Sequence, residues 1–200
     1  MTVGTEPPRR RRSEPRDRLL RTATEVFYAK GIHAVGIEEI VDRAQITRST
    51  LYRHFPGKEE LVVAYLQTAS QLERDAVTGM LTAEQSPADA VRAVARAIVG
   101  QIGNPAFRGC AFLNAAAEYP DVDHPVHRAI LDHRTWFADL VRTLFRAVFD
   151  EGWEESAALF VMLRDGAMTA GCLADPDQVG SVFLDGVERV LSTGGTPKEG

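Results

Sequence analysis

The chain has 200 residues, of which 44% are hydrophobic and 26% are charged, proportions that are ordinary for a folded protein of one or two domains. This apolar content argues against disorder of the whole chain, and no run of about 18 apolar residues suggests a membrane-spanning helix. Two cysteines, Cys110 and Cys172, are too few for a disulfide-stapled secreted scaffold, and the Pro/Arg-rich N-terminus is not a secretory signal. We therefore expect a soluble protein of the cytoplasm.

The net charge of −5 conceals an asymmetry along the chain. Residues 1–60 carry 12 Lys and Arg against 9 Asp and Glu, whereas residues 61–200 carry 11 against 19. A basic first third on an acidic body suggests that only the first part meets a polyanion. Ordinary scatter in composition is the alternative, so the case depends on the residue pattern.

The first predicted element is a flexible basic arm over residues 1–14, which contains the run Arg9 to Arg12 and few apolar residues. From Pro15 onward, apolar residues recur at spacings of three and four, which predicts an amphipathic helix that ends near Lys30. Gly31 then serves as its C-cap.

Two short helices follow, joined by a tight turn at residues 45–46. The first covers residues 37–44, and the second covers residues 48–55 with Thr47 as its N-cap. Pro56 ends the second helix, because proline cannot continue the hydrogen-bond ladder. This arrangement is typical of a helix-turn-helix.

Helical periodicity continues almost to the C-terminus, and no stretch alternates with the period of a strand. Three of the expected helices begin with a polar residue followed by proline, at Ser86, Asn104 and Asp175, which is typical of an N-cap with proline in the first turn. The pattern predicts an all-α protein without internal repeats. The expected helices cover residues 58–81, 87–103, 105–118, 125–150, 154–174 and 176–191.

The second short helix of the pair has the chemistry of a DNA-reading helix. Leu51 and Phe55 lie one turn apart and point inward, which leaves polar and basic side chains outward near the helix N-terminus. Arginine and serine can read base edges, whereas tyrosine, histidine and lysine can reach phosphates. A solvated amphipathic helix with incidental basic residues is the alternative. The residues assigned to DNA contact are Thr47, Arg48, Ser49, Thr50, Tyr52, Arg53, His54 and Lys58.

Residues 18–66 resemble the N-terminal domain of the TetR family of transcriptional regulators. The resemblance rests on Ala23, Phe27 and Gly31, on the apolar positions of residues 37–44, and on the runs Thr50-Leu-Tyr-Arg-His-Phe55 and Lys58-Glu-Glu-Leu61. It implies a three-helix DNA-binding domain over residues 15–60. It also implies a larger helical domain over residues 61–200 that binds an inducer and dimerises, and a homodimer on a palindromic operator.

Two residues depart from the family pattern. Gly36 stands where the family usually has a Ser or Thr cap, so a phosphate contact there is limited to the backbone or absent. Gln45 replaces the usual turn glycine, so this position must tolerate strain or a different turn.

The segment Arg108–Glu118 is expected to face a partner or a cavity, because Cys110, Asn114 and Glu118 follow one another at spacings of four in a largely apolar helix. Pairing of Asn114 and Glu118 with neighbouring polar groups is an equally weighted alternative. Nearby aromatic residues can supply an apolar pocket for a small organic inducer. The residues assigned to ligand binding are Phe112, Asn114, Glu118, Trp136 and Phe137.

The last two helices combine small residues, such as Gly166 and Ala170, with large apolar ones, such as Phe160 and Phe183. Small residues permit close helix approach. In a member of the family, this pattern indicates a dimer interface of four helices, two from each subunit.

Other functional classes find little support in the sequence. His124, His127 and His133 near carboxylates suggest a metal site, but His124 is better placed as a helix cap and the other two do not share a face, so we assign no metal and no cofactor. The chain lacks GxSxG, HExxH and Gly-rich nucleotide motifs, so we assign no catalytic residue.

A helical bundle that has lost DNA binding is a further alternative, which Tyr52, His54 and Lys58 disfavour. The sequence does not distinguish a repressor of transcription from an activator.

Overall fold

The computed structural model describes residues 14–198 of the chain. The chain divides into two compact units, Met1–Tyr65 and Leu66–Gly200. Helix α4 (Lys58–Met80) begins in the first unit and continues into the second. The division therefore falls within a helix, five residues after the boundary expected from the sequence. The expected basic arm, including Arg9 to Arg12, lies outside the described residues.

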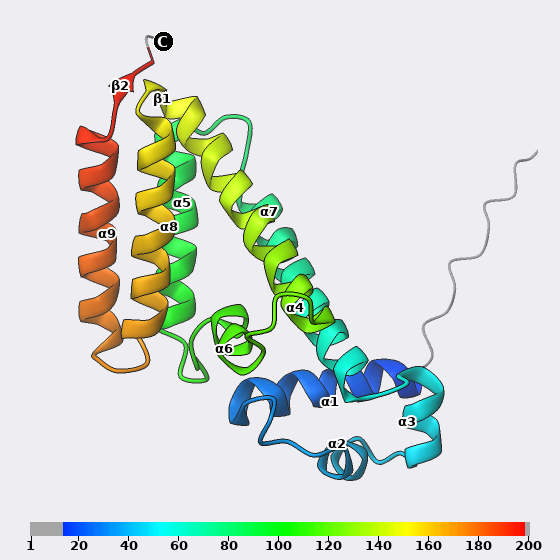
Figure 1. The fold of residues 1–200 in the computed structure, drawn as a ribbon. Helices are drawn as coiled ribbons and strands as arrows, with labels where there is room; N and C mark the ends of the chain where they lie inside the picture. The colour runs from blue at the N-terminus through cyan, green and yellow to red at the C-terminus, as the bar shows by residue number, and fades with distance from the viewer. Residues whose placement is uncertain (1–13, 199–200) are drawn as a thin grey trace, which may run out of the picture. The chain divides into compact units, whose positions relative to one another are not determined.

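The first unit consists of α1 (Glu14–Lys30), α2 (Ile37–Ala44), α3 (Arg48–His54) and the start of α4 (Figure 1). Helix α1 packs on both α2 and α3. The apolar stripe expected on the first helix is buried, and it meets the inward residues of the other two helices. This core contains Leu19, Ala23, Phe27, Ile40, Val41, Ala44, Leu51 and Phe55.

The ends of α1 and α2 both depend on a left-handed residue. Gly31 has φ of +88°, and its N–H donates to the carbonyl of Phe27 at 2.9 Å, which confirms the expected C-cap. Gln45 has φ of +54° and caps α2, and it is the one non-glycine residue with positive φ within residues 14–198. A side chain here costs free energy, so the strain expected at this departure from the family pattern is present.

The second unit is helical apart from one short pair of strands. Helix α8 lies between α7 and α9, and α5 packs against both α7 and α9 (Figure 1). Phe145, Phe149, Phe160 and Phe183 form a chain of ring contacts through this core. The elements are α5 (Pro87–Ile102), α6 (Ala111–Glu118), α7 (Pro125–Val148), β1 (Phe149–Glu151), α8 (Trp153–Ala170), α9 (Pro176–Thr193) and β2 (Thr196–Pro197).

Two sequence-based expectations about secondary structure are wrong. Residues 104–110 form turns, so the helix expected from residue 105 begins at Ala111. Asn104 caps a single turn through its side chain, which accepts from Ala106 N at 2.8 Å, and Gly109 at φ +86° interrupts the helix. Residues 149–151 form a strand that pairs with β2, although no strand was expected.

The remaining N-caps follow the sequence pattern. Ser86 accepts from Asp89 N at 3.1 Å, Asp175 accepts from Asp177 N at 3.0 Å, and His124 Nδ1 accepts from Val126 N at 3.2 Å. Each is followed by proline in the first helical turn. The all-α architecture with an N-terminal helix-turn-helix is confirmed.

Candidate nucleic-acid interface and ligand-binding region

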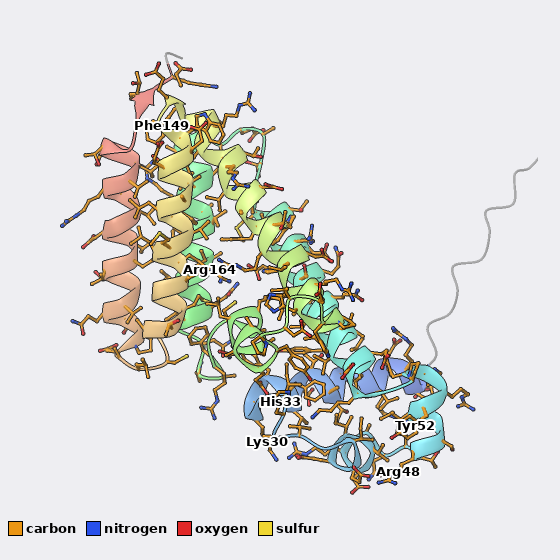
Figure 2. The ribbon with its side chains drawn as sticks, in the orientation of Figure 1. Lys30, His33, Arg48, Tyr52, Phe149 and Arg164 are labelled. Carbon is orange, nitrogen blue, oxygen red and sulfur yellow. The ribbon has the colours of Figure 1, made fainter. Side chains whose placement is uncertain are left out.

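Helix α3 is anchored on one face and open on the other. Leu51 is fully buried, and Phe55 is 3% exposed at the helix C-cap. Arg48, Ser49 and Tyr52 are exposed on the outer side, where Figure 2 labels Arg48 and Tyr52. The structure therefore places polar and basic groups where a recognition helix presents them to base edges and phosphates.

A network of hydroxyl groups fixes the start of α3. Thr47 Oγ1 accepts from the backbone N–H of Thr50 at 3.2 Å, and it lies 2.9 Å from the hydroxyl groups of both Ser49 and Thr50. This confirms Thr47 as N-cap. The remaining residues assigned to DNA contact also reach the surface: Arg53 is exposed, and His54 and Lys58 are partly exposed.

Acidic residues at the start of α2 pair with the basic residues around them, which the sequence interpretation did not foresee. Glu38 forms an ion pair with Arg48, so α3 is linked to α2. Glu39 lies 2.7 Å from Lys30 and 2.9 Å from Arg43, and the hydrogen bond from Lys30 lowers the pKa of Glu39. Gly36, as expected, caps α2 without a side-chain hydrogen bond.

The second unit contains a cluster of charged side chains centred on Arg164 of α8, which is itself buried (Figure 2). Arg164 is 2% exposed and donates to Asp165 at 3.0 Å and to Cys110 Sγ at 3.3 Å. Its second terminal nitrogen lies 3.9 Å from a carboxylate oxygen of Glu73, and its Nε is buried without a hydrogen-bond partner. Burial raises the pKa of Glu73.

His133 connects this cluster to the expected ligand-binding residues. Its ring is stacked on Phe112, with centroids 3.5 Å apart, and Nδ1 lies 3.1 Å from the hydroxyl of Ser70. Burial, together with the charges of Arg164, Arg74 and Arg134, lowers the pKa of His133 to about 3. The imidazole is therefore neutral at physiological pH.

The five residues assigned to ligand binding do not form one uniform lining. Phe112 and Phe137 are buried, Trp136 is half-buried and contacts both His133 and Phe137, and Arg164 lies over the Phe137 ring. Asn114 is exposed and donates to the carbonyl of Arg108 at 2.9 Å, and Glu118 is partly exposed. The structure thus gathers the aromatic members around His133 and gives Asn114 the local pairing that was the alternative.

Sequence reasoning missed Arg164, although a signal was present. Arg164 and Asp165 stand between apolar residues of a core helix, and such a charged group needs partners when it is buried. Which partners it finds depends on α4, α6 and α7, whose packing the local pattern does not reveal.

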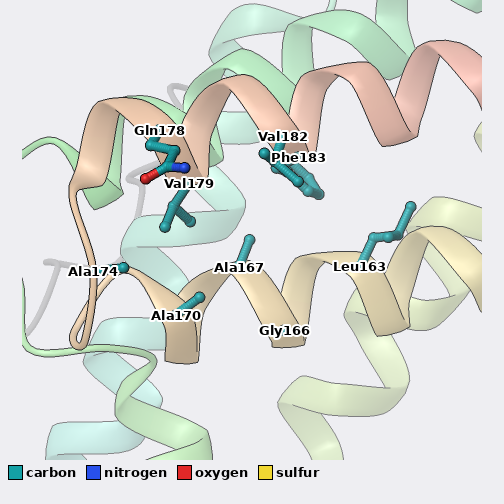
Figure 3. Close-up of a pocket in the computed structure, with 9 residues that line it drawn as sticks. All are labelled: Leu163, Gly166, Ala167, Ala170, Ala174, Gln178, Val179, Val182 and Phe183. Atoms are coloured by element: carbon teal, nitrogen blue, oxygen red, sulfur yellow. The ribbon is translucent and has the colours of Figure 1, made fainter.

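The second unit contains a polar cleft and an apolar groove. A polar cleft of about 220 Å³ lies between α4 and α7, where Ser70 and Arg74 face Asp132 and His133. An apolar groove of about 400 Å³ lies between α8 and α9, with small residues of α8 such as Ala170 opposite Val179 of α9 (Figure 3). None of the five residues assigned to ligand binding lines either cavity, but Trp136 and Phe112 lie directly behind Arg74 and His133.

The histidines considered for a metal site have other roles in the structure. His127 Nδ1 lies 2.6 Å from the carbonyl oxygen of Tyr119, His124 caps α7, and His133 is buried. Within the described residues, no group of three or more His, Cys, Asp or Glu side chains is arranged to hold a metal ion. No helix between residues 14 and 198 is both long and apolar enough to cross a bilayer.

The helix-turn-helix and its exposed face define a DNA-binding regulator, and known proteins agree with this class. The family model described as "Bacterial regulatory proteins, tetR family" matches residues 19–65. The crystal structure of SCO4454, a TetR-family transcriptional regulator from Streptomyces coelicolor, superposes with a TM-score of 0.88 at 55% identity, covering 90% of this chain and 96% of that one. The chain belongs to the TetR family of transcriptional regulators, and it is not an enzyme.

More distant relatives are also regulators of transcription. The regulator YxaF of Bacillus subtilis is 24% identical over 156 residues, which cover 76% of this chain and 81% of that protein. The transcriptional activator FasR of Mycolicibacterium smegmatis is 50% identical over 56 residues, which cover 28% of this chain but only 26% of that protein. The similarity to FasR is therefore restricted to about a quarter of each chain.

Proposed function

We propose that the protein is a ligand-responsive transcriptional repressor of the cytoplasm, which binds a palindromic operator as a homodimer and is released by a small, largely apolar inducer. The observation that carries the proposal is the outer face of α3, where Arg48, Ser49 and Tyr52 are exposed while Leu51 is buried. An exposed basic face on a firmly anchored short helix is suited to reading a major groove.

The proposed DNA contacts divide by chemistry. Arg48 and Ser49 lie at the N-terminal end of α3 and are assigned to base edges, whereas Tyr52, His54 and Lys58 are assigned to phosphates. Because Glu38 pairs with Arg48 in the free protein, reading a base requires Arg48 to exchange this partner for DNA. The arm with Arg9 to Arg12, outside the described residues, adds diffuse electrostatic attraction.

Fluorescence anisotropy with the DNA upstream of the protein's own gene tests this division. Arg48→Ala should cost about 1–3 kcal/mol on the operator and relax the preference at one base position. Lys58→Ala should weaken operator and scrambled DNA alike and reduce the salt slope by about one unit. Deleting residues 1–12 should flatten the salt dependence without changing the preferred sequence. An equal loss on both DNAs for Arg48→Ala would show that Arg48 contacts a phosphate.

The proposed dimer uses the outer face of α8 and α9. Val182 lines the apolar groove together with Gly166 and Ala170 and is 65% exposed (Figure 3). Met162 of α8 is 70% exposed. Exposed apolar surface of this kind indicates an interaction site. A second copy of the same two helices would cover it in a two-fold arrangement.

The proposed inducer site involves Phe112, Asn114, Glu118, Trp136 and Phe137. To release DNA, the inducer must bind the two conformations of the protein with free energies that differ by about 1–3 kcal/mol or more. Glu118→Ala should change the response to inducer in an operator-binding assay while operator affinity itself stays within about twofold of wild type. If operator affinity and thermal stability instead fell together, Glu118 would be a structural residue.

An activator is the second candidate, because FasR is named a transcriptional activator. Both functions need the same DNA contacts. A reporter gene placed behind the operator separates them: deleting the regulator raises expression if it represses and lowers expression if it activates.

A further inference from the structure

The polar cleft between α4 and α7 contains an arginine whose position is fixed while part of its hydrogen-bonding capacity is unused. The Arg74 guanidinium lies over the Trp136 ring, 4.4 Å from its centroid, and Nε donates to Ser70 Oγ at 3.2 Å. In the part of the chain that the structure describes, its two terminal Nη groups have no hydrogen-bond or ion-pair partner. A guanidinium held in this way presents a planar fork to the cleft.

The charges of the three arginines around the cleft are matched by the carboxylates of Glu73, Asp132 and Asp165, so the attraction for an anion comes from the Nη groups of Arg74 and not from a net positive charge. His133, which forms part of the lining, is neutral, and three arginines influence it: Arg74, Arg134 and Arg164. Arg134 is already paired with Asp165 through two hydrogen bonds of 2.7 and 2.6 Å. Glu73 lies 3.5 Å from His133 Nε2 and is the other acidic group below the cleft. Asp132 lies in the lining and is exposed to solvent.

We propose that this cleft binds the carboxylate of a small organic acid, with Arg74 as the anchoring residue. Two parallel N–H···O bonds from the Nη groups match the two oxygens of a carboxylate. The volume of about 220 Å³ lies below the roughly 300–1,000 Å³ of sites for drug-sized ligands, so the acid is about the size of benzoate. That the bound acid acts as an inducer rests on the proposed function. The acid would lie next to Arg74 and His133, which contact Trp136 and Phe112 respectively.

Trp136 provides a direct optical test, because Trp153 is the one other tryptophan of the chain. In a Trp153→Phe protein, benzoate should change the Trp136 emission saturably, whereas benzamide, which has the same shape but no charge, should bind at least tenfold more weakly. Isothermal calorimetry in the same protein gives a second readout that does not depend on the ring contact between Arg74 and Trp136.

Variants at Arg74 then test whether benzoate binds through this residue. R74Q should weaken benzoate at least tenfold, and R74K, which keeps the charge but loses the fork, should weaken it several-fold. R142Q is the matched control, since Arg142 is exposed on α7 and pairs with Asp139 outside the cleft. It should bind benzoate as the parent does, and circular dichroism should show that all three variants are folded.

Three results would overturn the proposal: no saturable binding of benzoate, equal binding of benzoate and benzamide, or unchanged binding by R74Q and R74K. These titrations contain no DNA, so a failure of the protein to bind its operator would contradict the proposed function and leave the site standing. Conversely, benzoate that binds through Arg74 but changes operator affinity less than twofold would overturn the role of this acid site in induction.

Discussion

Arg164 and His133 are the buried polar residues on which the interior of the second unit depends. Both are 2% exposed, and they approach Glu73 from α8 and α7 respectively. A buried charge is tolerated only when partners offset its lost hydration. Asp165, the Cys110 thiol and the Phe137 ring supply part of this compensation for Arg164, so removing one partner should cost more than the contact itself contributes.

His133 should make stability depend on pH. Its pKa is lowered from 6.5 to about 3 in the folded protein. Below pH 6.5, His133 is therefore protonated in the unfolded chain but not in the folded protein. Stability is therefore complete above pH 6.5 and is lost as pH falls from there toward 3. Between pH 7 and pH 5, this residue should lower the free energy of unfolding by about 1–2 kcal/mol.

Urea denaturation of wild type and His133→Gln at several pH values measures this effect. Glu73, whose pKa is raised by burial, works in the opposite direction, so the quantity to compare is the difference between the two proteins. That difference should shrink as pH falls from 7 to 5. A difference for His133→Gln that does not change with pH would contradict the buried neutral imidazole.

The role of a single residue could be predicted from the sequence when its hydrogen-bond partner lies only a few residues away in the chain. The caps at Thr47, Ser86 and Asp175 could be predicted because each bonds a backbone N–H two or three residues further on. The ion pairs of Arg48 with Glu38 and of Arg164 with Glu73 could not, because in each pair the two residues come from different helices.

At the scale of elements, α3 is a helix of seven residues that needs the rest of its unit. A helix of this length is unstable alone in water. It is held by Thr47 at its start, by Leu51 in the core and by the turn at Gln45, which joins α2 to the segment leading into α3. The left-handed conformation of Gln45 is therefore a cost that the packing of α2 and α3 offsets.

Exchanging residue types at the two left-handed caps tests this account. Gln45→Gly should stabilise the protein by about 0.5–1 kcal/mol, since relief of about 1–2 kcal/mol of strain exceeds the added freedom of the unfolded chain. Gly31→Ala should destabilise it by a similar amount for the reverse reason. Thermal denaturation followed by circular dichroism measures both, and a loss of stability in Gln45→Gly would show that the Gln45 side chain makes contacts worth more than the strain.

Element boundaries were predicted well where a cap and an apolar stripe agree, and poorly where they conflict. Asn104 and Pro105 have the form of a helix start, but Gly109 at positive φ ends the turn, so α6 begins six residues later than expected. The strand at Phe149–Glu151 depends on pairing with Thr196–Pro197, a contact across 40 residues or more that no local period reveals.

At the scale of the whole molecule, the proposed dimer connects DNA binding by the first unit with ligand binding by the second. Two-fold symmetry would present two copies of α3 to two half-sites of a palindrome, about one turn of DNA or more apart. The apolar face of α8 and α9 is the surface proposed to set that symmetry. The expected ligand-binding residues could be predicted only in part, since the aromatic ones cluster by packing whereas Asn114 faces outward.

Gly166 offers a way to break the dimer without harming the fold. It lies in the groove of the proposed interface, and a Cβ added there would meet no atom within 4 Å. Gly166→Arg should therefore leave each chain folded while its side chain prevents close approach of the partner. Gly100 on α5 is equally open, so Gly100→Arg is the matched control and should behave as wild type.

The most direct test of the central claim is sedimentation of a fluorescent upstream palindrome with wild type, Gly166→Arg and Gly100→Arg. We predict two chains bound per palindrome for wild type and Gly100→Arg, at least tenfold weaker binding when one half-site is scrambled, and a monomer with similarly weakened binding for Gly166→Arg. Wild-type protein that binds the palindrome no better than scrambled DNA, or that binds it as a single chain, would contradict the account.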